Sequence, residues 1–132
     1  MSTLSFKPEE RLKQLKLIDQ LFKEGTTIVA YPLRFLYLTT SADVIPQSKA
    51  AFSAPKRNFK KAVDRNLLKR RMRESYRLQK SQYYQFSEEA GFIYAGIFIY
   101  VAKEILAYEE IDKAITKVLR KWKKNYSAIT KD

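Results

Sequence analysis

The sequence has 132 residues, of which 45% are hydrophobic, enough for one domain with a modest core and too few for two. It contains no cysteine and no histidine, which excludes disulfides, thiolate or imidazole metal ligands, and nucleophile–histidine pairs. Its 26 Lys and Arg outnumber its 14 Asp and Glu, and the net charge of +12 predicts a polyanionic partner. We therefore expect residues 1–132 to form a single domain that binds nucleic acid.

The sequence also bears on where the protein works. Its first residues are followed by charge from Lys7 onward, without the apolar stretch of a signal peptide, and no hydrophobic run is long enough to span a bilayer. We expect a cytoplasmic protein with no membrane partner.

The first half of the chain predicts one helix and two or three strands. Apolar residues at spacings of three and four predict an amphipathic helix over 12–22, begun between positions 8 and 14 and ended by Gly25. Residues 26–40 are rich in β-branched and aromatic side chains, so they predict a strand that Pro32 breaks or bulges. A turn follows over 41–48, and a short strand follows over 49–55.

The second half predicts a long basic helix, a buried strand and a closing helix. The helix runs from residue 60 or 61 to residue 80, while 81–90 fits either a second helix or an ordered loop. Residues 92–103 are apolar at nearly every position, which is typical of a central strand. Helical spacing of apolar residues returns over 108–126. The fold class is α+β, a single-domain α/β sandwich with one sheet of about four strands and helices packed on it.

Positive charge is concentrated between Pro55 and Lys80. This segment holds eleven Lys and Arg against two acids, a net +9 of the total +12. On a helical wheel one face carries Leu68, Met72, Ser75 and Tyr76, and an adjoining face carries Asn66, Lys69, Arg70, Arg73 and Arg77. A basic face could serve solubility alone, but solubility does not require the charge to be focused in one segment.

The basic face suits a phosphate backbone. Arginine offers a planar fork that matches phosphate, lysine offers a point charge, and an asparagine among them can bond a sugar or base. Each phosphate neutralised should add about 0.7–0.9 to the magnitude of the slope of log affinity against log salt concentration. Charge does not distinguish RNA from DNA, although no helix-turn-helix, zinc-finger or zipper pattern is present. Glu74 lies four residues after Arg70, so we expect these two side chains to pair.

A second surface is predicted from strand alternation. Phe35 and Tyr37 point to one face of their strand, and Ile18 and Phe22 would border that face if the first helix packs beside it. An aromatic groove with cations near the strand ends would suit a single strand, whose bases stack on rings. The alternative interpretation is that these aromatic residues are ordinary core residues.

No catalytic constellation or protein metal site is expected. The acids fall mostly on exposed helix faces or turns, and pairs such as Glu88 with Glu89 are typical of helix surfaces.

Residues 62–75, AVDRNLLKRRMRES, resemble the signature of the protein subunit of bacterial ribonuclease P. The family pattern is approximately A-V-x-R-N-R-x-K-R-x-x-R-E, and the chain departs from it at Leu67, where the family usually has arginine. The resemblance extends over nearly the whole chain and is weakest over 83–89. The matching residues are Ala62, Val63, Arg65, Asn66, Lys69, Arg70, Arg73 and Glu74.

The resemblance implies a ribosomal-protein-like sandwich with a left-handed βαβ crossover, an exception to the usual hand. It implies a monomeric protein, one per catalytic RNA, that assists removal of the 5′ leader from precursor tRNA, with Mg²⁺ held mainly by the RNA. The residues implied to bind the catalytic RNA are Arg65, Asn66, Lys69, Arg70, Arg73 and Arg77. Those implied to bind the leader are Ile18, Phe22, Phe35, Tyr37, Ser53, Lys56, Arg57 and Lys103.

Two other functions fit the basic helix. A ribosomal or ribosome-assembly protein would use the same helix without any role in cleavage, but it would not need the aromatic groove. A nuclease that cleaves with its own metal site is the more distant alternative, and cleavage by the isolated chain would distinguish it.

Overall fold

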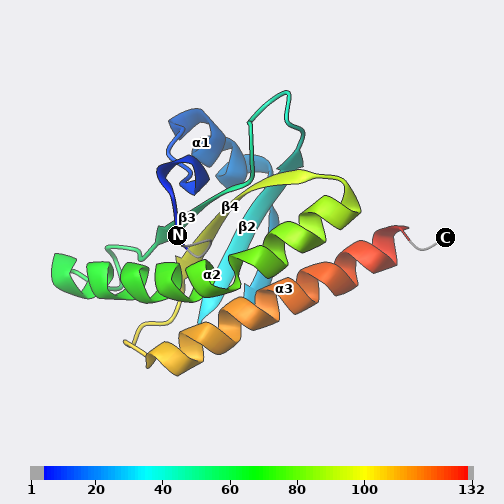
Figure 1. Ribbon diagram of the computed structural model, residues 1–132. Coiled ribbons are helices and arrows are strands. Elements are labelled where there is room, and N and C mark those ends of the chain that lie inside the picture. The colour runs from blue at the N-terminus through cyan, green and yellow to red at the C-terminus, as the bar shows by residue number, and fades with distance from the viewer. Residues whose placement is uncertain (1–4, 131–132) are drawn as a thin grey trace.

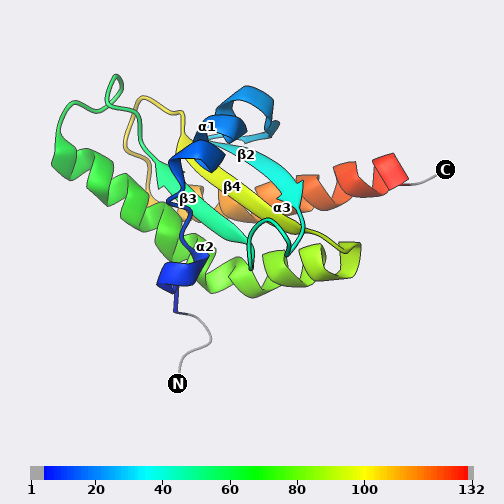
Figure 2. The ribbon, with the colours of Figure 1, turned by 90° about the horizontal axis from the view of Figure 1, so that it is seen from above.

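The computed structural model describes residues 5–130, which form one four-stranded sheet with helices on both faces (Figure 1). Figure 2 shows the sheet between α1 on one side and the pair α2 and α3 on the other. The elements in chain order are the 3-10 turn η1 (Pro8–Glu10), α1 (Leu15–Glu24), β1 (Thr26–Ala30), β2 (Leu33–Thr40), β3 (Lys49–Ser53), α2 (Ala62–Ala90), β4 (Ile93–Tyr100) and α3 (Tyr108–Thr130).

The sheet has the strand order β1-β2-β4-β3. β1 and β2 form an antiparallel hairpin, in which Ala30 pairs with Leu33 across a cis Tyr31–Pro32 bond. The break predicted at Pro32 is therefore confirmed, since this residue has no N–H for a ladder and separates two strands. β2 pairs antiparallel with β4, and β3 pairs parallel with β4.

α2 connects the parallel neighbours β3 and β4. In Figure 1 the helix lies in front of the sheet, both strands run towards the lower left, and β4 lies on the lower-right side of β3. This arrangement makes the crossover left-handed, as the resemblance implied.

The two faces of the sheet bury different side chains. The face under α2 and α3 is aromatic, and its buried residues include Phe35, Tyr94, Phe98 and Trp122. The face under α1 carries a smaller aliphatic cluster around Leu21, with Leu36, Ala95, Ile97 and Ile99 from the strands. α2 contributes the predicted residues Leu68, Met72, Ser75 and Tyr76, all fully buried.

Residues 81–90 continue α2 rather than forming a loop or a separate helix. The Tyr83 hydroxyl donates to the Ile115 carbonyl at 2.7 Å, and the Phe86 ring lies 5.3 Å from the Trp122 ring. The helix ends at Gly91, whose φ of 85° lies in the left-handed region that favours glycine. Packing against α3 therefore fixes a segment whose local sequence allows two structures.

A buried ion pair fastens the segment before α1 to α2. The Lys80 ammonium lies 2.6 Å from the Glu10 carboxylate, and the Tyr84 hydroxyl donates to the same carboxylate at 3.1 Å. The Leu12 N–H donates to the Ala50 carbonyl at 2.9 Å, so the segment lies along the outer edge of β3. Both contacts place Arg11 beside the basic helix.

Candidate nucleic-acid interface

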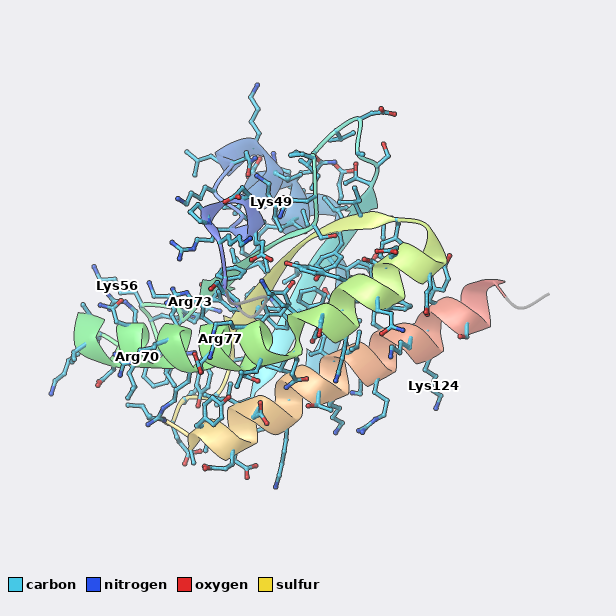
Figure 3. The ribbon with its side chains drawn as sticks, viewed as in Figure 1. Lys49, Lys56, Arg70, Arg73, Arg77 and Lys124 are labelled. Atoms are coloured by element: carbon cyan, nitrogen blue, oxygen red, sulfur yellow. The ribbon has the colours of Figure 1, made fainter. Side chains whose placement is uncertain are left out.

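The predicted basic face of α2 reaches β3 at Lys69 and Arg73. Figure 3 shows Arg70, Arg73 and Arg77 along the same helix. Asn66 and Arg70 are exposed, and Lys69 is half-buried. The Arg73 guanidinium carbon lies 5.8 Å from the centroid of the Phe52 ring of β3, which directs this arginine across the sheet edge. The helix therefore presents Lys69, Arg70 and Arg73 on one face, and the Phe52 ring holds Arg73.

Arg73 and Arg11 share a hollow at this edge. Four cations line it together with apolar side chains of the sheet edge, namely Arg11, Lys13, Lys69 and Arg73. Burial and the charge of Arg11 lower the pKa of the Arg73 guanidinium. None of the described residues that line the hollow is acidic. An anion such as a backbone phosphate would relieve the repulsion between these cations.

Arg11 and Lys13 were missed by the sequence prediction. Arg11 is placed by the pairing of its backbone with Ala50, and its guanidinium carbon lies 5.7 Å from the Phe6 ring centroid. A basic residue just before a helix carries no local signal of that pairing, so only its place in the sheet reveals its role.

Two members of the predicted RNA-binding set have protein partners. The Arg65 Nη1 donates to the carbonyls of Phe59 and Lys60 at 2.8 and 2.9 Å, which closes the loop before α2. Arg77 pairs with Glu74 at 2.6 Å. The expected pair between Glu74 and Arg70 is wrong, because the carboxylate turns towards the residue three positions later instead.

The predicted aromatic groove is wrong in its placement. Phe35 and Tyr37 share a face, as alternation predicts, but that face lies under α3 rather than α1. The Phe35 side chain is 0% exposed, and the Tyr37 ring packs 4.3 Å from the Trp122 ring. Burial raises the pKa of the Tyr37 hydroxyl. Phe35 is therefore a core residue, and Tyr37 is a half-buried one at its margin.

The remaining predicted leader residues occupy two places. Ile18 is half-buried against the aliphatic cluster under α1, while Phe22 is 53% exposed. The other four lie at the carboxyl ends of the parallel pair β3 and β4: Ser53 ends β3, Lys56 and Arg57 follow it, and Lys103 follows β4. The structure thus brings the cations of the predicted groove to one end of the sheet and leaves one exposed ring on α1.

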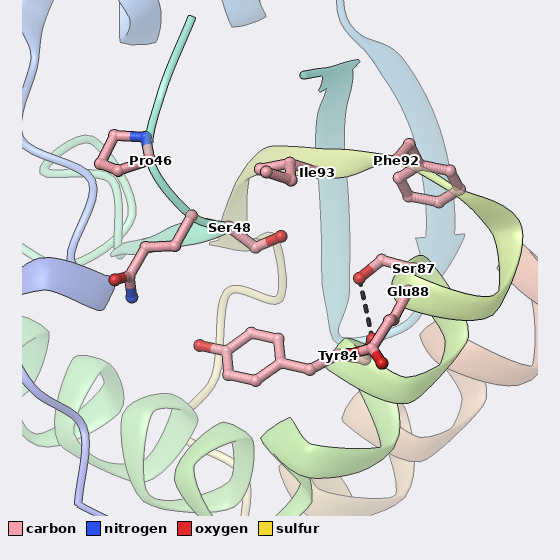
Figure 4. A pocket seen from close by; sticks show the side chains of 8 residues that line it. Pro46, Ser48, Tyr84, Ser87, Glu88, Phe92 and Ile93 are labelled. Atoms are coloured by element: carbon pink, nitrogen blue, oxygen red, sulfur yellow. Dashed lines mark hydrogen bonds between the residues drawn. The ribbon is translucent and has the colours of Figure 1, made fainter. Parts of the chain in front are cut away.

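Another hollow lies at the far end of α2, between that helix and the loop before β3 (Figure 4). Its lining includes Tyr84, Phe92 and Ile93, and the Ser87 hydroxyl at its wall donates to the Tyr84 carbonyl at 3.0 Å. Among the described residues that line it, Glu88 is the charged one. An acidic and largely apolar hollow does not suit a phosphate.

Within residues 5–130, no three carboxylates lie close enough together to hold a metal ion. None of the helices in the same range combines the length and apolar character needed to cross a membrane.

The chain matches a known protein family over most of its length. The family model for ribonuclease P matches residues 6–123, which include the basic helix, the sheet and most of α3. The chain belongs to the ribonuclease P protein family. It is thus a protein component of a ribonucleoprotein endoribonuclease, and its partner is the ribonuclease P RNA.

Relatives in the ribonuclease P protein family cover most of the chain. The ribonuclease P protein component of Porphyromonas gingivalis strain W83 is 36% identical over 118 residues, 89% of this chain and 85% of the relative. That of Chlorobium phaeobacteroides is 36% identical over 101 residues, 74% of this chain and 69% of the relative.

Solved ribonuclease P proteins share the fold. The Staphylococcus aureus protein superposes with a TM-score of 0.66 at 21% identity, covering 86% of this chain and 94% of its own. The Thermotoga maritima protein gives 0.64 at 20% identity, covering 85% and 96%. These similarities confirm the α+β fold predicted from the sequence.

Proposed function

We propose that this protein binds the ribonuclease P RNA through the basic face of α2 and the 5′ leader of precursor tRNA beside α1. The observation that carries the proposal is the hollow in which Arg11, Lys13, Lys69 and Arg73 converge without an acidic lining residue. Repulsion among these cations disfavours the free protein, and a phosphate backbone would remove it.

The leader site follows from the faces of the sheet. Phe35 is buried under α3 and Tyr37 is half-buried there, so the predicted leader residues that a ligand can reach lie on α1 and at the end of the sheet. There the exposed Phe22 ring can stack on a base, and Lys56, Arg57 and Lys103 at the sheet end can follow the backbone. A flexible single strand can reach both, because its backbone bends freely between the ring and the cations.

Catalysis in this proposal belongs to the RNA. One monomeric protein joins one RNA, and Mg²⁺ for hydrolysis is held mainly by RNA phosphates. The protein's cations position the substrate strand and reduce the repulsion between two RNAs, which lowers the Mg²⁺ concentration that the complex requires.

The first test is reconstitution. Precursor tRNA labelled at its 5′ end is incubated at low Mg²⁺ with the protein, with ribonuclease P RNA from the same source, and with both together. We expect leader removal only in the mixture, or far faster there. Tight RNA binding without faster cleavage would contradict the proposal and favour a structural RNA-binding role, and cleavage by the protein alone would indicate a protein nuclease.

The α2 surface is tested by reversing one charge. Arg73→Glu should weaken assembly with the RNA while leaving the protein folded, because a glutamate there can pair with Arg11. The matched control is Lys16→Glu, an equal charge change at an exposed position of α1. Equal affinities of the two variants, measured by filter binding over a range of salt, would remove the α2 assignment.

A further inference from the structure

A second basic surface lies on α3. From Lys113 to Thr130 the helix carries six Lys and Arg and no acid, because its acids are confined to Glu109, Glu110 and Asp112 at the start. Opposite charges mixed along a helix would serve solubility equally well. The segregation of charge therefore indicates an anionic binding partner outside the protein.

Four of these cations form a strip along one line of the helix. Lys113, Lys117, Arg120 and Lys124 recur every three or four residues, and all four are exposed. They lie opposite the buried line of Ile111, Ile115, Val118 and Trp122. With one cation per turn, the strip is about 16 Å long.

Nothing in the described part of the chain neutralises most of this strip. Lys117, Arg120 and Lys124 form no hydrogen bond or ion pair with residues 5–130, and Lys113 lies 3.7 Å from the exposed Glu110. Lys121 is not part of the strip, because its ammonium donates to the Val29 carbonyl at 2.5 Å. The strip is thus available to an external anion.

The strip destabilises α3, and nothing within the helix offsets that destabilisation. Like charges three and four residues apart destabilise a helix by about 0.2–0.5 kcal/mol per pair. The helix dipole favours cations in the last turn, but the last turn of α3 contains no basic residue. The internal energetics of α3 therefore do not account for the arrangement.

The two basic surfaces point in different directions. α2 turns Ser75, Gln79 and Tyr83 towards α3. Its Lys69 and Arg73 lie beside β3, where they line the hollow with Arg11. Figure 3 shows Lys124 directed away from the cluster of Arg70, Arg73 and Lys56. A strand bound along α2 would not reach the strip without crossing the ridge between the helices.

We infer that the strip on α3 binds the phosphate backbone of a second segment of the ribonuclease P RNA. The recognition is independent of sequence, since lysine and arginine on a regular spacing follow phosphates and do not read bases. The protein then lies between two segments of the RNA, with α2 against one and α3 against the other.

The test neutralises the strip. A Lys117→Gln, Arg120→Gln, Lys124→Gln variant should bind ribonuclease P RNA more weakly, with the slope of log affinity against log salt reduced by about 2 to 3. A Lys117→Arg, Arg120→Lys, Lys124→Arg variant keeps the charges and should bind as the unchanged protein does. Unchanged affinity and slope in the neutralised variant would overturn the inference, as would a defect confined to precursor tRNA binding.

A second measurement locates the contact on the RNA. The chain contains no cysteine, so Lys113→Cys or Asn66→Cys gives a single thiol for a tethered hydroxyl-radical probe. The two probes should cleave the ribonuclease P RNA in different segments. Cleavage from position 66 without cleavage from position 113 would overturn the α3 contact and leave the α2 assignment intact.

Discussion

The two faces of the sheet differ in how much they bury. The face under α2 and α3 is closed by two long helices over a cluster of aromatic rings, in which Phe35 lies 4.4 Å from Phe98 and 5.3 Å from Trp122. The face under α1 is covered by one helix of ten residues, which buries Leu21 and leaves Phe22 largely exposed. The aromatic face therefore contributes more to stability, and the α1 face leaves one aromatic ring exposed to solvent.

This difference decides what aromatic residues can do. A ring under two helices is shielded from solvent and from ligands, so its removal lowers the free energy of unfolding. A ring at the margin of the α1 face can be removed without leaving a cavity. We expect Tyr37, half-buried against Trp122, to belong to the first group.

Trp122→Ala should give the largest effect. Trp122 is fully buried and its ring contacts Phe35, Tyr37, Tyr94 and Phe86. The free energy of unfolding should fall by about 3–5 kcal/mol, as for other large aromatic truncations. Urea denaturation followed by circular dichroism measures it, and a loss below about 1 kcal/mol would show that this face is not the main core.

Leu21→Ala makes the corresponding change on the opposite face. Leu21 is the fully buried residue of α1, but a short helix can shift to fill part of the cavity. We expect a loss of about 2–3 kcal/mol, near the lower end for buried leucine. A loss equal to that of Trp122→Ala would mean that the two faces contribute alike.

Gly96→Ala probes how closely the aromatic face is packed. A Cβ at this position of β4 would lie 2.5 Å from the Phe35 ring. Overpacking should cost about 1–3 kcal/mol. Combining the substitution with Phe35→Leu should recover part of the loss relative to the sum of the two single changes, and strict additivity in denaturant titrations would contradict direct contact.

Phe22→Ala should have the smallest effect on stability, within about 0.5 kcal/mol, because the ring is largely exposed. In the reconstituted enzyme it should weaken binding of precursor tRNA more than binding of mature tRNA, since only the precursor carries a leader. Leu15→Ala, at a residue of the same helix that is 81% exposed, is the control. Equal losses for both RNAs would remove Phe22 from the leader site.

Local patterns predicted several elements well. The spacing of Leu68, Met72, Ser75 and Tyr76 identified the buried face of α2, and Pro32 identified the break between β1 and β2. Both follow from geometry within a few residues. The local propensities of residues 81–90 do not distinguish a helix from a loop, and the contacts of Tyr83 and Phe86 with α3 decide for the helix.

The candidate site was predicted less completely. Alternation correctly put Phe35 and Tyr37 on one face, but a period of two does not say which helix covers that face. The proximity of Arg11 to Arg73 depends on the pairing of the N-terminal segment with β3, in which Arg11 pairs with a residue 39 positions later. The position of the α3 strip relative to α2 depends likewise on how the two helices pack.

The charge of the protein, the faces of its helices and the signature over residues 62–75 follow from residue identity and local spacing. Packing in the folded chain sets which aromatic residues are closed to ligands, which cations converge on a hollow and which point elsewhere. These properties arise from pairing and packing between distant segments, and their free energy is set by contacts that no local pattern encodes.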